Sequence, residues 1–532
     1  MIKAKIEEGY DVIVVGAGLA GIQATYHAAI NGARVLMVTC SHIFSGSSFY
    51  PKTWGLGLVS ANDCDKEEFV SLINQVGCNM NDKSLVEKLV NTTDDILNDF
   101  KYLGIPLKHA INSKQQEFIP CFDNKTRIWH GLEKSGIKAS YLKLLDRDNI
   151  DTFDNTTVVD IQIIDNKVKG VVLVHKGNLI VIPCKAVVFA GGGMGNLYRD
   201  SLNTKDSTGL LQYLAMKHGS KLINLEFQQM MYGYKGKTLN TIYNEKIFKY
   251  TEFTSDGSLL FNDVDKALLE KRSLYGPFTS RLDSKVIDFK ICGALNENKR
   301  VFAKYQDDLF SSDSEFIKVY FDWLEKSENI IVKEPFEIGI FYHASNGGIH
   351  IKEDTSCEIH GLFASGEVCG GISGADRIGG LASATALVFG KIAGISASSY
   401  IKNEKLCKLD YVVDSCVENA GKYIKEIQAL ASKYLMVIKS EKSLLEGLEN
   451  LKNISKKLTY TNKFDMDKYL ESSKLNALIA LSFAKFQAAL MRKESRGSHF
   501  RSDYPIEDKA YQKRIVSYML DNRVYSEWEI KI

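Results

Sequence analysis

The 532-residue sequence predicts an α/β fold organised around a parallel β-sheet. Near the N-terminus an almost wholly apolar run from Asp11 to Val15 leads into glycines at positions 16, 18 and 21. Two later apolar runs, 186–190 and 361–365, also lead into glycine. Runs of this length suit strands that are buried on both faces of a parallel sheet, so we expect all of them to belong to one sheet.

The first run begins a strand–helix–strand unit with the G-x-G-x-x-G spacing of nucleotide-binding turns. A helix is expected from Ile22 to Asn31, Gly32 suits its left-handed C-terminal cap, and 33–39 reads as the second strand. Gly16 permits the tight turn, Gly18 lets the backbone approach a pyrophosphate, and Gly21 lets helix and strand pack closely. The alternative is a glycine-rich turn without a ligand. The flanking strand and helix favour a Rossmann-type nucleotide site.

One part of the usual dinucleotide pattern is missing. An Asp or Glu commonly follows about twenty residues later and binds the ribose. Here the second strand ends Val38-Thr39-Cys40, without an acid. This disfavours an NAD-linked dehydrogenase, which keeps only the glycine spacing in its support.

The strand positions predict a discontinuous nucleotide domain. We expect its first part over 1–221 and its second part over 336–400, because the glycine-ended runs at 186–190 and 361–365 should join the same sheet. The polar, mixed segment 222–335 is predicted to be an inserted α+β capping domain. The Lys/Glu/Leu-rich segment 401–532, with helical spacing near Leu475 to Met491, is predicted to be a helical C-terminal domain.

The composition excludes several classes. With 67 basic and 65 acidic residues the formal net charge is +2, which gives no support for a nucleic-acid partner. The ten cysteines form no C-x-x-C pair, so we expect no metal or iron–sulfur site and a reduced, cytoplasmic protein. The N-terminus has no signal-peptide pattern, and the apolar stretch 381–395 is too short and interrupted to span a membrane, so no membrane segment is expected.

Several blocks, in order, resemble the signatures of one enzyme family. They are Ser45-Gly-Ser-Ser48 with Trp54-Gly-Leu-Gly57, the glycine-rich 190–198, the segment from Gly219 to Gln228, His343 to Gly348, Gly366-Glu367 with 374–380, and Glu494 to His499 with Asp503-Tyr-Pro505. The chain thereby resembles the flavoprotein subunits of fumarate reductase and succinate dehydrogenase, together with L-aspartate oxidase, as a divergent member. In that family the second strand commonly ends in Thr-Lys or Ser-Lys, which Thr39 matches in part.

The resemblance implies FAD as the cofactor. Some members carry a histidine covalently attached to the flavin; the matching stretch 46–51 has none and His42 lies too early, so non-covalent FAD is expected. Glu367 is expected to hold a ribose or ribityl hydroxyl rather than to be a solvated loop acid. The predicted cofactor-binding residues are Gly16, Gly18, Leu19, Ala20, Gly21, Thr39, Ser47, Ser48, Gly55, Gly57, Ala190, Gly191, Gly366, Glu367, Arg377, Ala382 and Ser383.

The resemblance also implies a catalytic set of Arg281, His343 and Arg377. Arg281 matches an arginine that donates a proton to the substrate carbon, although it can also be read as a surface salt-bridge residue. His343 and Arg377 match residues that bind a carboxylate, for which the planar guanidinium is well suited. His343 can alternatively be read as a satisfied core histidine.

The sequence departs from the family pattern at two places in the capping domain. The family usually has His-Pro-Thr after L-E-F-x-Q, where this chain has Met230, Met231 and Tyr232. A T-E-x-x-R-G-E-G relay is represented by Thr251-Glu252, with Ser255 where the relay arginine belongs. Plain fumarate or succinate is therefore not the expected optimal substrate.

The sequence thus predicts an FAD-dependent oxidoreductase that transfers hydride between flavin N5 and a small carboxylate substrate. Enoate reduction and dehydrogenation are both open. An L-aspartate-oxidase-like amino acid oxidase, or a flavoprotein electron-transfer subunit that needs a partner protein, are the alternatives.

Overall fold

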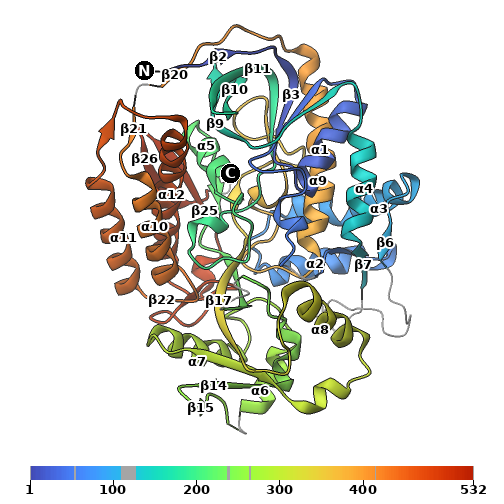
Figure 1. The fold of residues 1–532 in the computed structure, drawn as a ribbon, viewed down its shortest axis with the longest axis vertical. Helices are drawn as coiled ribbons and strands as arrows, with labels where there is room; N and C mark the ends of the chain where they lie inside the picture. The colour runs from blue at the N-terminus through green and yellow to red at the C-terminus, as the bar shows by residue number, and fades with distance from the viewer. Residues whose placement is uncertain are drawn as a thin grey trace.

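The computed structural model describes residues 2–52, 55–108, 127–235, 240–262, 265–413 and 415–530. Trp54 of the predicted flavin loop lies outside these ranges. Figure 1 shows the nucleotide-binding sheet and its helices in the upper part of the molecule. A smaller α+β unit, drawn in green and yellow, lies below, and the C-terminal helices lie to one side. The predicted fold class is confirmed.

The central sheet is built from strands that are far apart in the sequence. β3 (Tyr10–Val15), β4 (Val35–Val38), β8 (Ile150–Phe153) and the second half of β11 (Asn178–Phe189) run parallel in the order β8-β4-β3-β11. β19 (Leu362–Ala364) adds in parallel to the other side of β11. The first half of β11 pairs antiparallel with β10 (Lys167–His175), which pairs with β9 (Thr156–Ile164). The expected strands near 11–15, 33–39, 186–190 and 361–365 therefore do share one sheet.

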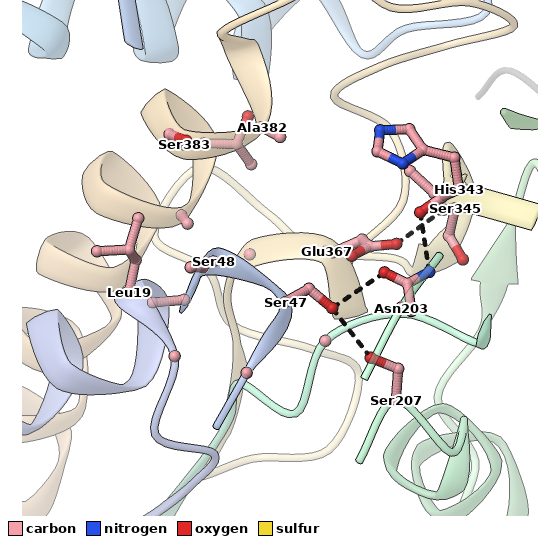
Figure 2. Close-up of a pocket in the computed structure, with 18 of the residues that line it drawn as sticks. Leu19, Ser47, Ser48, Asn203, Ser207, His343, Ser345, Glu367, Ala382 and Ser383 are labelled. Carbon is pink, nitrogen blue, oxygen red and sulfur yellow. Dashed lines mark hydrogen bonds between the residues drawn. The ribbon is translucent and has the colours of Figure 1, made fainter. Parts of the chain in front are cut away.

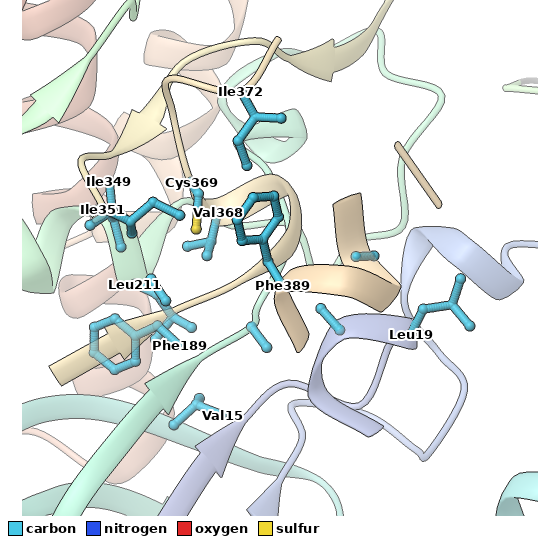
Figure 3. Packing of buried hydrophobic residues seen from close by; sticks show 14 of the residues in the cluster. Val15, Leu19, Phe189, Leu211, Ile349, Ile351, Val368, Cys369, Ile372 and Phe389 are labelled. Atoms are coloured by element: carbon cyan, nitrogen blue, oxygen red, sulfur yellow. The ribbon is translucent and has the colours of Figure 1, made fainter. Parts of the chain in front are cut away.

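Helices α1 (Leu19–Ile30) and α9 (Leu381–Tyr400) pack against each other and against this sheet. A Cβ on Gly390 would lie 2.6 Å from the backbone oxygen of Ala20, and one on Gly394 would lie 2.4 Å from that of Ala24. The glycines therefore let the two backbones approach closely. Figure 3 shows apolar side chains of the core beside these elements, including Val15, Phe189, Val368 and Phe389.

Helix α9 is longer than the apolar stretch that the sequence suggested. In length and composition the helical segment Leu381–Asn403 could cross a bilayer, yet 67% of its most apolar window is buried within the protein. A largely apolar helix is expected when neighbours cover most of its surface, as α1 and the sheet do here.

The inserted unit has its own sheet and its own core. Its strands are β13 (Gln228–Tyr234), β17 (Phe336–Ser345), β16 (Val301–Tyr305), β14 (Thr251–Ser255) and β15 (Ser258–Leu259), in that order across the sheet. Helices α6 (Lys266–Arg272), α7 (Lys285–Asn296) and α8 (Glu315–Glu328) belong to the same unit. Because β17 pairs with β13 and β16, the chain stays in this sheet until Ser345, ten residues beyond the predicted boundary of 335.

The C-terminal segment is helical only in part. Helices α10 (Ala420–Tyr434), α11 (Glu441–Lys456) and α12 (Met466–Met491) pack together, as predicted. The chain then forms a hairpin of β25 (Ile515–Leu520) and β26 (Arg523–Trp528), and β25 pairs with β12 (Leu222–Ile223). The predicted helical C-terminal domain thus also contains a hairpin that the sequence analysis did not predict. Asp521 and Asn522 both have positive φ, which is the geometry of a two-residue hairpin turn.

The remaining elements connect these units. They include α2 (Lys66–Val76), α3 (Lys83–Tyr102), α4 (Lys134–Leu145) and α5 (Leu210–Lys217), a sheet of β5 (Gly57–Ser60), β7 (Ile128–Leu132) and β6 (Leu107–Lys108), and β18 (Gly348–Ile349), which pairs with β12.

Candidate active site

A cleft of about 480 Å³ lies where the nucleotide-binding sheet meets the inserted unit. Its size is within the usual range for small-molecule sites. Residues from the ends of β3, β4 and β11 line one side, and residues of β13 and β17 line the other. The carboxyl ends of parallel strands are where open α/β sheets bind their ligands.

The glycines after β3 form the floor of the nucleotide half. Gly16 has a φ of +121°, and a Cβ there would lie 2.2 Å from the backbone oxygen of Ala190. A Cβ on Gly21 would lie 1.9 Å from the oxygen of Gly16. Among the described residues, a Cβ on Gly18 would meet only Ser48 Oγ, at 3.7 Å. Gly16 and Gly21 therefore permit the turn and its packing, whereas Gly18 keeps the cleft side of the turn open.

The N-termini of α1, α5 and α9 all reach the cleft. Leu19 and Ala20 of α1, Leu210 and Leu211 of α5, and Ala382 and Ser383 of α9 line it. The first turn of a helix carries backbone N–H groups without intrahelical partners and the positive end of the helix dipole. Such convergence suits a phosphate-containing ligand.

Most of the predicted cofactor residues also line this cleft. They are Gly16, Gly18, Leu19, Ala20, Thr39, Ser47, Ser48, Gly55, Gly57, Ala190, Gly191, Gly366, Glu367, Arg377, Ala382 and Ser383. Gly21 does not line it and supports the turn from behind. Figure 2 shows Ser47 between Asn203 and Ser207: its hydroxyl donates to Asn203 Oδ1 at 3.0 Å and lies 3.4 Å from Ser207 Oγ.

Glu367 is held tightly by backbone. The N–H of Ser345 donates to Glu367 Oε1 at 2.9 Å, and a Cβ on Gly193 would lie 2.2 Å from the same oxygen. Burial raises the pKa of the Glu367 carboxyl above its ordinary value. Glu367 is thus not a solvated loop acid. It lies between Ser345 at the end of β17 and Gly193 after β11.

Arg377 and His343 form the polar end of the cleft next to the inserted unit. Gln229 Oε1 accepts hydrogen bonds from Nε and Nη2 of Arg377 at 3.1 and 2.6 Å, which fixes the guanidinium against β13. Burial, and secondarily the charge of Arg377, lower the pKa of His343 to about 3, so its ring is neutral at neutral pH. Its Nδ1 is buried and has no hydrogen-bond partner among the described residues. His343 is therefore not a satisfied core histidine.

The segment from Glu494 to His499 contacts the loop that carries Arg377. A Cβ on Gly497 would lie 2.5 Å from the backbone oxygen of Ala375. Both the N–H and the hydroxyl of Ser498 donate to that oxygen at 2.9 Å. The N–H of Ser280 donates to the oxygen of Gly497 at 2.7 Å. The loop from 494 to 499 therefore connects the Arg377 loop with the inserted unit.

Comparison with known proteins identifies the family. The family model for the FAD binding domain matches residues 11–382, and that for the C-terminal part of the fumarate reductase flavoprotein matches residues 424–530. The chain therefore belongs to the family of flavoproteins that carry this FAD binding domain. It is an FAD-dependent oxidoreductase, so the predicted family, FAD as the cofactor and the enzyme class are confirmed, while non-covalent attachment stays a prediction.

Similar proteins cover nearly the whole length at low identity. An uncharacterized FAD-dependent oxidoreductase of Methanocaldococcus jannaschii is 25% identical over 95% of this chain and 96% of its own. One subunit of the CoM/CoB fumarate reductase of Methanothermobacter marburgensis has the same identity and coverage. An L-aspartate oxidase of Mesorhizobium japonicum is 23% identical over 94% of this chain and 92% of its own.

Solved flavoprotein structures share the fold. A chain of an Escherichia coli quinol fumarate reductase variant superposes with a TM-score of 0.81 at 20% identity, over 98% of this chain and 97% of its own. A chain of the Mycobacterium smegmatis Sdh1 complex gives a TM-score of 0.79 at 23% identity, over 99% and 94%.

Arg281 lies outside the lining of the flavoprotein's cleft. Its Nη1 donates to the backbone oxygen of Val76 at 3.3 Å. Thr279 and Pro277 of the same segment line the cleft instead. The structure therefore places His343 and Arg377 in the cleft lining and Arg281 just outside it, where its charge acts on the carboxyl of Asp376, the residue before Arg377.

Among the residues that line the flavoprotein's cleft and were absent from the predicted set, two bear on its substrate end. One is Gln229, which positions Arg377. The other is Glu245: it is 2% exposed and accepts the N–H of Tyr232 at 3.2 Å, and burial raises the pKa of its carboxyl to about 8. The predicted relay glutamate, Glu252, is exposed and does not line the cleft. No local pattern marks Glu245, because a strand more than ten residues away buries it.

Proposed function

We propose that this protein binds FAD non-covalently and transfers hydride between flavin N5 and a small carboxylate substrate, by enoate reduction or by dehydrogenation. The observation that carries the proposal is Arg377. Its guanidinium lies in the same cleft as the glycine floor and the helix N-termini that suit FAD, and Gln229 holds it in place. A fixed arginine beside a cofactor site is suited to orienting a carboxylate for reaction.

In this proposal, the residues of the chain bind and orient the substrate. The Gln229 oxygen occupies Nε and Nη2 of Arg377, which leaves Nη1 to meet a substrate carboxylate. The neutral His343 ring adds a second polar contact beside it. When bound, FAD supplies the hydride chemistry, and the protein supplies position and charge.

The proton at the substrate carbon requires a group inside the cleft. Because Arg281 does not line the cleft, we infer that the Glu245 carboxyl is the better candidate to hold this proton. Its raised pKa, about 8, keeps it mainly protonated at neutral pH. Arg272, which is buried and paired with Asp288, lies near enough to stabilise the carboxylate that remains after proton loss.

The predicted cofactor residues that line the cleft are the proposed FAD contacts. Non-covalent binding is supported by the loop from 46 to 51, which carries no histidine. His42 does not line the cleft; its side chain is 73% exposed and lies 3.8 Å from Asp154. Acid precipitation of the holoprotein should release the yellow colour into the supernatant. A yellow pellet would contradict this part.

The decisive experiment is flavin re-oxidation. The reduced holoprotein is mixed with enoates and, separately, with oxygen, and the flavin absorbance is followed. We expect a carboxylate to accelerate re-oxidation, and Arg377→Gln to abolish that acceleration while flavin stays bound. If no carboxylate changes the rate in the wild type, the proposal fails.

Relatives suggest what to add to the screen. One is named as part of a multi-subunit fumarate reductase, so an electron-transfer partner protein is part of the proposal. Another is named L-aspartate oxidase, which makes amino acids necessary in the screen as reductants of the oxidised flavin.

A further inference from the structure

On the side of the inserted unit, part of the cleft is lined by three apolar side chains. Leu202, Met231 and Ile242 line the cleft and pack together, with Phe341 behind them. Met231 comes from β13, and Ile242 follows that strand in the chain. We call Leu202, Met231 and Ile242 the apolar wall.

The apolar wall stands at a defined place relative to Arg377. Gln229, which holds the guanidinium, and Met231 belong to the same strand, and both line the cleft. Met230 lies between them and packs in a different cluster, with Leu197 and Phe278. Residues two apart along a strand are separated by about 6.6 Å. A small ligand whose carboxylate meets Arg377 and that runs along β13 would therefore place its far end against Met231.

That far end lies near an acidic group. Glu245 accepts the N–H of Tyr232, the residue after Met231, so its carboxyl lies beside the apolar wall. In either protonation state Glu245 contributes no positive charge. A second carboxylate there would exchange water for methionine and isoleucine side chains, which is costly without a counter-charge.

Two lysines, Lys134 and Lys246, line the cleft, and the charge of Lys134 interacts with Glu328, whose carboxylate accepts a hydrogen bond from Thr241, the neighbour of Ile242. Lys134 donates to the backbone oxygen of Tyr50 at 3.0 Å. The acids Glu367 and Asp376 lie beside Arg377 and supply no positive charge at the apolar wall. Lys246 also lines the cleft and is the residue to test as a rival holder of a second carboxylate.

We propose that the cleft takes a small monocarboxylate whose far end is apolar, an alkyl- or aryl-substituted enoate or its saturated counterpart, in preference to a dicarboxylate. The preference rests on the proposed function, because it assumes that Arg377 binds the carboxylate of the substrate. The apolar wall then selects the other end.

Binding to the oxidised holoprotein tests this without turnover. Butanoate and succinate differ at one end, a methyl group against a carboxylate, and each is titrated while the flavin spectrum is followed. We expect butanoate to bind at least tenfold more tightly than succinate. The paired re-oxidation experiment compares crotonate with fumarate, and crotonate should be the faster oxidant of the reduced flavin.

A charge placed in the apolar wall should reverse the preference. Met231→Lys should improve succinate binding and weaken butanoate binding, each by about tenfold, with the flavin still bound. Met230→Leu is the matched control on the same strand and should leave both affinities unchanged. If Met231→Lys does not fold, the wild-type comparison decides alone.

The outcomes separate the two proposals. If the wild type binds succinate as tightly as butanoate or more tightly, this inference is wrong while the proposed function stands. If Lys246→Met then removes the succinate affinity, that lysine holds the second carboxylate. If the wild type responds to neither ligand, and Arg377→Gln changes nothing, the proposed function fails and this inference fails with it.

Discussion

The three glycines after β3 should respond differently when each is changed to alanine. Gly16→Ala places a methyl group 2.2 Å from the backbone oxygen of Ala190, at a φ of +121°. Gly21→Ala places one 1.9 Å from the oxygen of Gly16. Gly18→Ala meets its nearest described neighbour, Ser48 Oγ, only at 3.7 Å. The first two substitutions collide with backbone, and the third points into the cleft.

The magnitudes follow from these distances. To restore a normal contact, the backbone at Gly16 or Gly21 must move by about 1 Å, and overpacking of this kind costs about 1–3 kcal/mol. Gly16→Ala adds the strain of its positive φ, about 1–2 kcal/mol. Gly18→Ala should cost almost no stability. It should weaken FAD at least tenfold, about 1.4 kcal/mol, if a pyrophosphate lies against this backbone.

Two measurements separate stability from binding. The melting temperature of the apoprotein reports the fold, and quenching of FAD fluorescence reports affinity. Gly32→Ala is the matched control, because Gly32 has a φ of +89° and no described atom within 4 Å of a Cβ, so only backbone strain is added. Melting temperatures should rank Gly16→Ala lowest and Gly18→Ala equal to wild type. Unchanged FAD affinity in Gly18→Ala would refute the placement of the pyrophosphate on this turn.

Other predictions concern charged groups. Burial raises the pKa of Glu245 to about 8, so the folded protein retains a proton that the unfolded chain loses, and Glu245 should make stability fall as pH rises from about 4.5 to 8. Glu245→Gln should flatten this fall in melting temperature, whereas Glu328→Gln, another buried glutamate of the inserted unit, should not. Burial lowers the pKa of Lys485 to about 7, so between about pH 7 and 10.5 the folded protein has lost a proton that the unfolded chain still holds. The contribution of this lysine to stability should therefore rise over that range, and Lys485→Met should remove the rise from the melting curves. Arg377→Lys keeps the charge but loses the planar fork, so carboxylate affinity in a flavin titration should fall at least tenfold while FAD stays bound; an unchanged affinity would argue against Arg377 as the carboxylate site.

The nucleotide half of the molecule could be predicted because the residues that determine its fold lie close together in the sequence. The residues from 11 to 39 contain both strands, the helix between them and the glycines that their contact requires. Strand β19 was predictable from the same signal, a short apolar run that ends in glycine. The hairpin near the C-terminus was not predicted, although Asp521-Asn522 is a recognisable turn pair. The helical spacing of apolar residues, which is real up to the end of α12 at Met491, was taken to describe the whole C-terminal segment.

The substrate half could be predicted only in part, because its geometry depends on contacts across the fold. Arg377 stands in a glycine-rich motif and could be selected from the sequence as a cleft residue, whereas Gln229, which orients it, is 148 positions away in the sequence. Arg281 was selected by its place in a motif. Which residue of a segment faces a cleft depends on the backbone path, and here Thr279 takes that place.

The two halves of the cleft therefore constrain the sequence in different ways. The half that suits FAD consists mostly of backbone: glycines that admit no side chain and the first turns of helices. Such a surface tolerates few substitutions. The half that would meet the substrate consists of side chains from β13, β17 and the Arg377 loop. Among the described residues the side chain of Met231 makes no backbone hydrogen bond, so membership of the family identifies the cofactor and leaves the choice of substrate to a few side chains.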